Sequence, residues 1–332
     1  MLPAIAEKLA PGTVDRTTLE VEDPDTGALA STQVLLARGA GEGPVLCLLS
    51  AQHGTEINGS AAIHLLFRHL DLADLAGVII AAPIANPLAA RIKRQAFPTD
   101  HGWTENCPHN MNRLWPGEAD GTVTQRMAAA LWEHCVQPAH AVIDFHGHAP
   151  QYGPLTLVRA TSDAGLAVAK AFGVAHLQMT RETRGGYLYD VAAREGKAAI
   201  LVELPPLRIV DPKSVRTALA GIRNVMANLR MTAREERPIE VALAWPEAES
   251  HTWHAPTDGI VLAHVDPGSI VQEGKLVAEL ISLNDCTVAE EVVAPFRGVV
   301  ALIGCPMKYI DSYDTDIANR GEPYARMVRC DL

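Results

Sequence analysis

The sequence carries a histidine and a glutamate three residues apart, His53 and Glu56, directly after an apolar run. That run, Val45 to Leu49, predicts a buried strand that ends in Gln-His-Gly just before a helical pattern begins. Residues three apart share one side of a helix, and open α/β sheets bind ligands at the carboxyl ends of their strands. The pair could therefore supply two zinc ligands. A two-residue motif is equally compatible with a capping glutamate beside a loop histidine.

Two more apolar strands end on side chains of the same kind. Ala141 to Phe145 leads into His146, and Ala199 to Val202 leads into Glu203. Two histidines and one glutamate are the ligand set of catalytic zinc sites that leave a fourth position to water, and bound Zn²⁺ lowers the pKa of that water toward 7. A second carboxylate can then take the proton and pass it to a leaving nitrogen. Glu203 suits this role, because it ends a buried strand before the stiff Pro205-Pro206.

Each of these residues also has a purely structural interpretation. His146 could bond to backbone at a strand end, and Glu203 could pair with an arginine. His148 is a rival for third ligand, since side chains alternate along a strand, but Gly147 interrupts the strand and favours His146. Asp144 could hold a ring nitrogen of His146 from outside the metal shell. The joint appearance of these groups at successive strand ends favours the zinc site.

Residues 86–121 show no sustained helical or strand period, and a loop of that length in a compact domain is usually functional or disordered. Its basic side chains stand out in an acidic protein: Arg91, Lys93, Arg94 and Arg113. An arginine beside an asparagine, as in Asn112-Arg113, can bind a carboxylate through two parallel bonds and one further donor. Another arginine aimed at an oxyanion would stabilise charge that develops in the transition state. The alternative is a solvated basic loop.

These side chains need a sheet that brings the strand ends together. Up to about residue 230, apolar strands alternate with helical patterns, which predicts βαβ units and a mainly parallel sheet. Strands are expected at 33–37, 45–49, 77–83, 141–146, 155–158 and 199–203. Helices are expected at 58–70, 124–137, 163–171, 190–196 and 212–230. The expected fold class is therefore α/β.

A second, smaller domain is expected after a charged break at residues 234–238. Beyond it the pattern changes to short strands and turns, and Ala255 to Val261 recurs as Ala294 to Val300. Two related hairpin units predict a small all-β, barrel-like domain with internal pseudo-symmetry. We therefore divide the chain into residues 1–235, which carry the chemistry, and 236–332.

Composition narrows the classes of partner and compartment. The chain has 332 residues with 39 acidic and 28 basic side chains, a net charge of -11, whereas a nucleic-acid groove needs the opposite balance. The N-terminal residues do not resemble a secretion signal, and no apolar run is long enough to span a bilayer. The six cysteines are scattered, without a Cys-x-x-Cys pair, which is typical of reduced structural thiols. We expect a cytoplasmic protein with neither a nucleic-acid nor a membrane partner.

Four motifs taken in order resemble the succinylglutamate desuccinylase/aspartoacylase family, a branch of the zinc carboxypeptidase-like hydrolases. They are His53-Gly54-Thr55-Glu56, Asn112-Arg113, Asp144-Phe145-His146 and Val202-Glu203. The resemblance covers roughly residues 30–230, and the late barrel is similar to the C-terminal β-domain of many members. It implies an α/β fold with a zinc carboxypeptidase-like central mixed sheet flanked by helices. It also implies one Zn²⁺ per chain and hydrolysis of a small N-acyl amino acid to a carboxylate and a free amine.

The resemblance also implies a role for each matching residue. His53, Glu56 and His146 would be the metal ligands, and Glu203 would be the general base. Asn112 and Arg113 match the pair that grips a substrate carboxylate. Arg94 falls near the position of an arginine that polarises the scissile carbonyl, and Arg91 could replace it because the loop aligns loosely.

Two departures from the family pattern leave part of the function open. Many relatives follow the base with a glycine run, whereas this chain has Leu204 to Leu207, so the acyl group and the side-chain preference are undetermined. The C-terminal barrel also resembles lipoyl and biotinyl carrier domains. Asn284 to Thr287 stand where those domains carry a modified lysine, so a carrier role is excluded and a packing surface, a lid or a homo-oligomer surface remains.

Two alternative functions differ in what they require. A metallocarboxypeptidase acting on short peptides would need an open groove, which the β-domain could cap. A non-catalytic binding module on the same fold would not need all four active-site positions, yet all four are filled.

Overall fold

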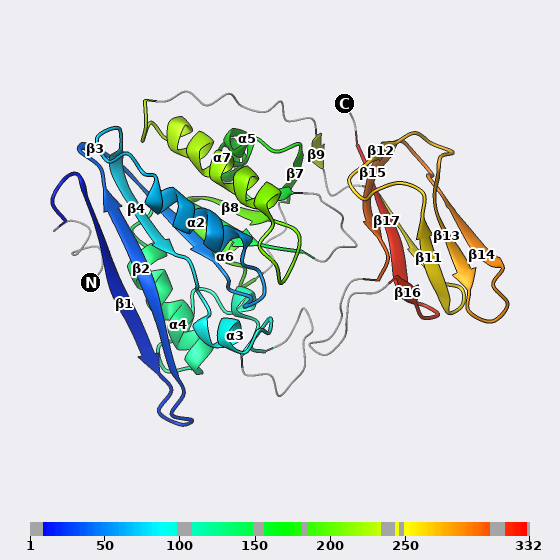
Figure 1. Cartoon of the computed structure of the whole chain (residues 1–332), viewed down its shortest axis with the longest axis horizontal. Helices are drawn as coiled ribbons and strands as arrows, with labels where there is room; N and C mark the ends of the chain where they lie inside the picture. The colour runs from blue at the N-terminus through cyan, green and yellow to red at the C-terminus, as the bar shows by residue number, and fades with distance from the viewer. Residues whose placement is uncertain are drawn as a thin grey trace.

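The structure, a computed structural model, has a large α/β part and a smaller all-β part beside it (Figure 1). It describes residues 9–97, 108–148, 156–180, 185–233, 243–245, 249–305 and 316–330. The described strands of the first part form one 9-stranded sheet, and those of the second form two 4-stranded sheets.

The large sheet is mixed. Its strands are β1 (Thr13–Glu22), β2 (Leu29–Arg38), β3 (Gly41–Ser50), β4 (Ala76–Ala82), β5 (Ala141–His146), β6 (Leu157–Ala160), β7 (His176–Met179), β8 (Ala198–Glu203) and β9 (Leu243–Trp245). They are arranged in the order β1-β2-β4-β3-β5-β8-β6-β7-β9. The four central strands β4, β3, β5 and β8 run parallel, while β2 and β6 run antiparallel to their central neighbours. Strands β6, β7 and β9 also run parallel to one another, so the expected mainly parallel sheet and the mixed sheet implied by the family resemblance are both confirmed.

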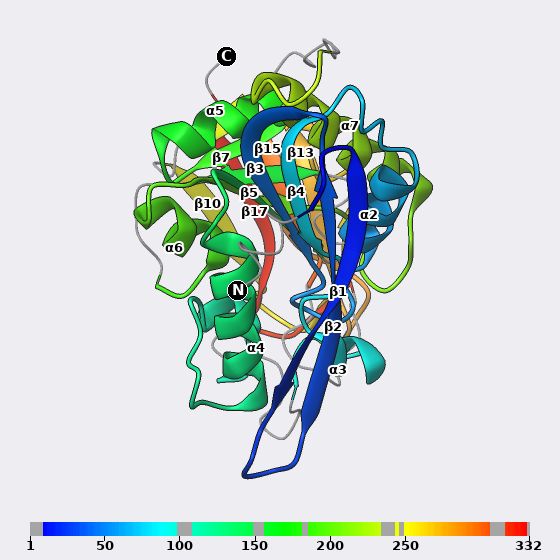
Figure 2. The ribbon, with the colours of Figure 1, turned by 90° about the vertical axis from the view of Figure 1, so that its left-hand side faces the viewer.

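Helices cover both faces of this sheet. One face is covered by α2 (Asn58–Arg68), α5 (Asp163–Phe172) and α7 (Pro212–Asn228), and the other by α4 (Val123–Leu131) and α6 (Leu188–Arg194). Figure 2 shows the sheet between α4 and α6 on one side and α2 and α7 on the other. The helix expected at 124–137 ends as an α-helix at Leu131 and continues as one π-helical segment, η2 (Trp132–Val136).

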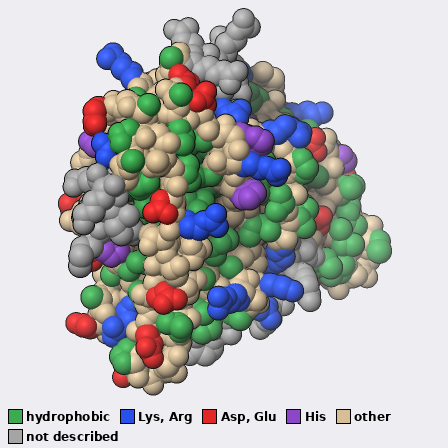
Figure 3. All heavy atoms as spheres, turned by 60° about the vertical axis from the view of Figure 1, so that its left-hand side comes forward, with side chains coloured by type: hydrophobic (Ala, Val, Ile, Leu, Met, Phe, Trp, Pro, Cys, Tyr) green, Lys and Arg blue, Asp and Glu red, His purple; other side chains and the backbone are tan. Residues whose placement is uncertain are grey.

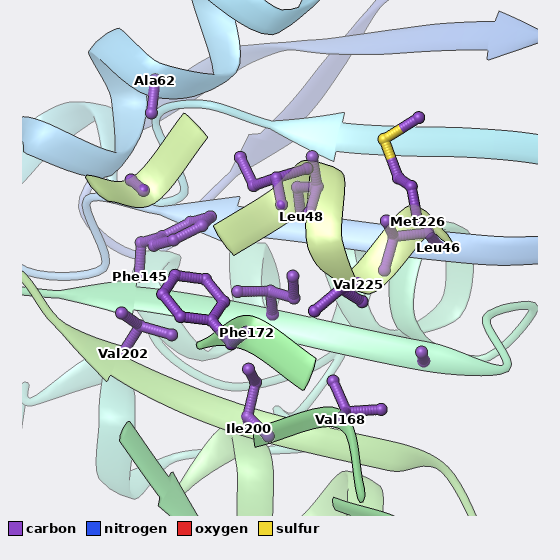
Figure 4. Close-up of a cluster of buried hydrophobic side chains, with 14 of the residues drawn as sticks. Leu46, Leu48, Ala62, Phe145, Val168, Phe172, Ile200, Val202, Val225 and Met226 are labelled. Carbon is purple, nitrogen blue, oxygen red and sulfur yellow. The ribbon is translucent and has the colours of Figure 1, made fainter. Parts of the chain in front are cut away.

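The core on the α2 side decides where the polar side chains of the central strands point. Phe145 and Val202 are buried in this core, where the Phe145 and Phe172 rings lie 6.4 Å apart (Figure 4). Helix α2 approaches closely because Gly59 faces β5: a Cβ there would lie 2.3 Å from the Phe145 Cβ. Side chains alternate along a strand, so the neighbours of these two residues, His146 and Glu203, face the α4 and α6 side.

The loop at residues 86–121 is partly ordered into short elements. It contains α3 (Pro87–Arg91) and a 3-10 turn, η1 (Met111–Arg113). Asn86 caps α3 by accepting a hydrogen bond from the Ala89 amide, and Asn110 caps η1 by accepting one from the Asn112 amide. These two caps fix the parts of the loop that precede Arg94 and Arg113.

The all-β part is built from two facing antiparallel sheets. Its strands are β10 (Ser250–His254), β11 (Gly259–Ala263), β12 (Ile270–Val271), β13 (Leu276–Ser282), β14 (Val288–Val293), β15 (Gly298–Ile303), β16 (Ile317–Ala318) and β17 (Pro323–Arg329). The two sheets have the orders β10-β17-β15-β12 and β14-β13-β11-β16, and they enclose a common apolar core.

The sequence repeat corresponds to a structural repeat in the all-β part. Ala255 and Ala294, the first residues of the two copies, are each 2% exposed, and each copy leads through a bend into a strand that starts at a glycine. The strand that begins in the first copy, β11, lies in one sheet, and the strand that begins in the second copy, β15, lies in the other. The predicted all-β fold of this region is therefore confirmed, and its internal pseudo-symmetry stays a prediction.

The two parts are in contact through a small apolar cluster. Leu157 of β6 packs with Val299 and Ala301 of β15 and with Val328 and Cys330 at the chain's end. The expected break at 234–238 lies outside the described residues. Strand β9 follows it yet pairs with β7 of the large sheet. The division into 1–235 and 236–332 stays a proposal, in which β9 belongs to the first sheet by its hydrogen bonds.

No helix in the described part of the chain is long and apolar enough to cross a membrane. On the face shown in Figure 3, acidic and basic side chains are interspersed with apolar ones.

Candidate metal centre

Three predicted ligands from two strand ends converge in the structure. His53 and Glu56 follow β3, and His146 ends β5, its parallel neighbour in the sheet. One ligand atom from each lies within 4.8 Å of the others, and all three residues are buried. Among the described residues this is the group of histidine, cysteine and acidic side chains that could hold a metal ion. His148 does not belong to it, which agrees with the preference for His146.

The turn that carries His53 and Glu56 is packed tightly against α3. Gly54 lies so close to this helix that a Cβ would be 2.2 Å from the Ala89 carbonyl carbon. Ala51, which precedes the turn, has a φ of 54°, a left-handed conformation that costs a non-glycine residue about 1–2 kcal/mol. Its carbonyl accepts a hydrogen bond from the Asn86 amide at 3.0 Å. The backbone around the two ligands is thus set by contacts as well as by local preference.

The orientation of the His53 ring follows from its outer nitrogen. His53 Nε2 lies 2.9 Å from Asn110 Oδ1, an oxygen that also accepts the Asn112 backbone N–H at 3.0 Å. Because this oxygen can only accept, Nε2 must carry a proton and donate it. The inner nitrogen, Nδ1, faces Glu56 Oε1 at 2.8 Å.

A chain of buried hydrogen bonds orients the His146 ring in the same way. Trp115 Nε1 donates to Gln52 Oε1 at 2.7 Å, and Gln52 Nε2 donates to Asp144 Oδ1 at 2.6 Å. The second Asp144 oxygen lies 3.1 Å from His146 Nε2, which donates to it because a carboxylate accepts. The inner Nδ1 of His146 faces Glu56 Oε2 at 2.9 Å. Asp144 therefore holds a ring nitrogen of His146, as the sequence analysis expected.

At the middle of this site, lone pairs on nitrogen and oxygen face one another without enough protons between them. With Nε2 protonated on both rings, the two inner nitrogens present lone pairs to the two oxygens of Glu56. Gln95 Nε2 already donates a hydrogen bond to Glu56 Oε1, and the Gly147 amide donates one to Glu56 Oε2, both at 3.1 Å. A divalent cation relieves this concentration of donor atoms, and the outer contacts are of the kind that orient metal-bound imidazoles. The residues present therefore fit a zinc ion.

The electrostatics of the protein without metal reflect the same crowding. Burial alone would raise the pKa of the Glu56 carboxyl, but the facing His53 and His146 rings hold that pKa far below its usual range. Burial alone would lower the pKa of His146, but Asp144 and Glu56 raise it well above the usual value. The Glu56 carboxyl and the His146 ring thus each favour the charged form in the other's presence.

Glu203 lies beside the centre and outside the ligand group. It ends β8 directly opposite His146 in the parallel register, and its side chain is 13% exposed. Arg159 of β6 approaches it, with Nη1 3.9 Å from Glu203 Oε1. Glu203 therefore does approach an arginine, as the structural interpretation expected. It also lies next to His146 of the candidate metal site.

The segment after Glu203, Leu204 to Leu207, is held by hydrogen bonds to α2. Asn58 Nδ2 donates to the carbonyls of Leu204 and Pro206 at 3.3 and 3.0 Å, and Asn58 Oδ1 accepts from the Asp211 amide at 2.8 Å. The helix that follows the metal motif therefore also fixes the wall beside the predicted base.

The predicted substrate residues differ in how they are engaged. Asn112 is 2% exposed: its Oδ1 accepts from the Leu188 amide at 3.0 Å, and its Nδ2 lies 3.2 Å from His146 Nε2. Arg113 is half-buried, with its guanidinium 3.8 Å over the Tyr187 ring and Nη1 donating to the Asn112 carbonyl. Asn112 is therefore held beside the centre through its Oδ1, and Arg113 is the more exposed member of the pair. Their roles toward substrate stay predictions.

Burial separates the two candidates for the oxyanion arginine. Arg91 is exposed on the last turn of α3, whereas Arg94 is half-buried directly before the buried Gln95, whose amide touches Glu56. This difference favours Arg94, and its role toward an oxyanion stays a prediction.

Sequence reasoning missed the residues that orient the ligands. They are Gln52, Gln95, Asn110 and Trp115. Gln52 adjoins the motif and Asn110 lies two residues before Asn112, so polar side chains flanking the motifs were the available signal. Gln95 and Trp115 carried none, because they reach the centre through tertiary contacts alone.

Comparison with known proteins gives a class of amide-hydrolysing enzymes with an α/β fold, with which the candidate metal site agrees. The family model of the succinylglutamate desuccinylase/aspartoacylase catalytic domain matches residues 42–229. The chain belongs to this family.

Three relatives illustrate the similarity. The chain is 29% identical over 274 residues to an N-alpha-acetyl-L-2,4-diaminobutyric acid deacetylase of Halomonas elongata, covering 79% of this chain and 78% of the relative. It is 25% identical to the product-bound ectoine utilization protein EutE (DoeB) of Ruegeria pomeroyi, with a TM-score of 0.76 and 95% of both chains covered. A succinylglutamate desuccinylase from a Silicibacter species, 23% identical with a TM-score of 0.76 over 97% of both chains, shares the fold.

Proposed function

We propose that this protein is a zinc-dependent hydrolase that removes the acyl group from a small N-acyl amino acid. The observation that carries the proposal is the convergence of the two inner imidazole nitrogens on both oxygens of Glu56. Each ring has its outer nitrogen held by an oxygen acceptor, Asn110 for His53 and Asp144 for His146. Family membership supports the same class of reaction.

His53, Glu56 and His146 would hold the zinc ion. A zinc ion held by three protein side chains supplies Lewis-acid activation of water and of a carbonyl group. The buried contacts from Asp144 and Asn110 keep the inner nitrogens of both rings free of protons and aimed at the centre. Gln95 and the Gly147 amide hold the carboxylate of Glu56 in the plane that both rings face.

Glu203 would move the proton. Its place at the end of β8, level with His146 and outside the ligand group, suits a carboxylate that takes a proton from water and delivers it to the leaving amine. The segment after it is held by Asn58, so the carboxylate is presented from a fixed strand end. A base fixed in this way needs little reorganisation when the proton is transferred.

Two arginines would bind charge on the substrate. Arg113, stacked on Tyr187, would grip the substrate carboxylate through its guanidinium, whose Nη1 also donates to the Asn112 carbonyl. Arg94 would stabilise negative charge that develops on the carbonyl oxygen. A substrate with a free carboxylate and a neutral amide fits this division of charge.

The relatives suggest where to begin the search for the substrate. The Halomonas elongata relative is named for deacetylation of an acetylated diamino acid, and a family name refers to succinylated glutamate. We propose an N-acetyl or N-succinyl amino acid as substrate, with an N-acetyl diamino acid as the first candidate. A small molecule, rather than nucleic acid or a membrane, is the expected partner.

A metal analysis coupled to a substrate panel tests the proposal. The purified protein should contain about one zinc per chain, and chelation should abolish turnover that added zinc restores. The panel should compare N-acetyl and N-succinyl amino acids with dipeptides of the same amino acids. Faster hydrolysis of the dipeptides would support the metallocarboxypeptidase alternative. Bound zinc without hydrolysis of any panel member would favour a non-catalytic binding module.

A further inference from the structure

The predicted base has a cation beside it that belongs to a different strand. Arg159 Nη1 lies 3.9 Å from Glu203 Oε1, and the two side chains are 32% and 13% exposed. At this distance the contact is an ion pair without a direct hydrogen bond. The carboxylate oxygens therefore remain available to accept a proton, although the charge of Arg159 restricts where they lie.

The geometry of β6 explains how Arg159 reaches the carboxylate. Strand β6 runs antiparallel to β8, so that Leu157 lies opposite Glu203 and Arg159 lies opposite Leu201. Directly paired residues share one face of a sheet, and so do residues two apart. Arg159 thus projects on the same face as Glu203 and reaches back along the strand to its carboxylate.

Strand β6 is itself held by the all-β part of the protein. Leu157, two residues before Arg159 and 6% exposed, packs with Val299, Ala301 and Val328. Burial of this leucine side chain stabilises the contact, so it fixes the start of β6 at the level of Glu203. Arg159 is therefore presented from a supported strand.

We propose that Arg159 is a positioning residue that holds the Glu203 carboxylate in place beside the metal centre. This inference rests on the proposed function, in which Glu203 is the base. The pair contributes little to folding, because partly exposed ion pairs are weak in water. Its effect on catalysis is larger, since a displacement of about 1 Å can cost up to a hundredfold in rate.

The test compares Arg159→Gln and Arg159→Lys with wild type, on an N-acyl amino acid that the wild type hydrolyses. Arg159→Gln should lower kcat by about tenfold or more and leave KM within about twofold. The lysine variant keeps the charge and should recover part of the loss. Arg194→Gln is the matched control, since Arg194 pairs with Asp190 at 3.4 Å on α6 and has no place in the centre. It should behave as wild type.

A double-mutant cycle with Glu203→Gln separates this inference from the proposed function. If Arg159 acts through Glu203, Arg159→Gln should have little further effect in the Glu203→Gln background. Additive losses, an increase in KM with kcat unchanged, or an unchanged kcat would each overturn the positioning role. Near-normal kcat in Glu203→Gln alone would instead reject Glu203 as the base.

A crystal structure of Arg159→Gln gives a readout that does not depend on turnover. The Glu203 side chain should lose its single conformer, whereas the three ligands and their outer contacts should be unchanged. A Glu203 carboxylate that kept one conformer in the variant would overturn the inference.

Discussion

The protonation of an imidazole ring at this centre is decided by the atom that its outer nitrogen meets. For His146 this atom is Asp144 Oδ2, which accepts from Nε2 at 3.1 Å. Gln52, itself held by Trp115, saturates the other Asp144 oxygen. The orientation of this ring thus depends on three side chains outside the group that could hold a metal ion.

Asp144→Asn tests this control of the ring. The amide could present an N–H to Nε2, which would favour the tautomer with the proton on the inner nitrogen and oppose metal binding. Loss of such an outer partner typically costs about 10–100-fold in metal affinity, and we expect a loss of this size. Competition against a chelator of known affinity measures it. His148→Ala, which removes the rejected ligand, should bind zinc as wild type does.

Glu203→Gln tests the base separately from the metal. The substitution keeps the shape of the side chain and removes its ability to accept a proton, so kcat should fall by about a hundredfold or more. Zinc content should equal that of wild type, because Glu203 lies outside the ligand group. Loss of zinc in this variant would place Glu203 among the ligands and contradict the assignment.

At the scale of the elements, the site depends on a close approach between the metal turn and α3. A Cβ at position 54 would collide with backbone atoms of Ala89 and Ala90, which cannot move aside as a flexible side chain could. Only a glycine at position 54 therefore lets the turn that holds His53 and Glu56 lie this close to α3.

Gly54→Ala should consequently damage both stability and metal binding. Overpacking of this kind costs about 1–3 kcal/mol or more, and the displaced turn should weaken zinc binding because His53 and Glu56 move with it. Urea unfolding and chelator competition measure the two effects. Gly185→Ala is the control, because a Cβ there meets no described atom within 4 Å. Equal stability of the two variants would show that the turn has room to shift.

The elements that the sequence predicted best are those with a continuous apolar signal. The strand expected at 141–146 matches β5, since an apolar run interrupted only by Asp144 leads to His146 before Gly147. Only one strand was expected before residue 40, yet β1 precedes β2. It escaped notice because it is largely exposed and polar and pairs with β2 alone. Strand β7, four residues with one fully buried side chain, also lacked a recognisable pattern.

The meeting of the three candidate ligands was predictable from the sequence, whereas the contacts of the residues that orient them were not. His53, Glu56 and His146 follow apolar strands that must be parallel neighbours, so their meeting could be inferred from the chain. Asn110 and Gln95 lie in a loop without a period, and their convergence is a property of the folded loop. Arg159 was out of reach because β6 runs opposite to β8, a reversal that the alternating pattern did not reveal.

For the whole molecule, a histidine far from the centre makes stability depend on pH. Burial lowers the pKa of His176 from 6.5 to about 4. The unfolded chain therefore takes up this proton first as the pH falls. The contribution of His176 to the free energy of unfolding is complete above about pH 6.5, declines as the pH falls toward 4, and does not change further below that value.

His176→Gln should flatten this dependence. We expect the difference in unfolding free energy between wild type and variant to shift against the wild type between pH 6.5 and 4, and to stay constant above pH 7. Urea unfolding of the metal-free proteins over this range measures the difference, since acidification also releases zinc by protonating its ligands. A pH-independent difference would show that His176 is solvated in the native state.

The contact between Leu157 and the all-β part also has a meaning in the order of synthesis. Every residue assigned to the centre, from His53 to Glu203, leaves the ribosome before β15 and β17 exist. Val299 and Val328, on which Leu157 rests, belong to those two late strands. A translation product that stopped before them would contain the complete set of chemical groups with the strand beside Glu203 uncovered.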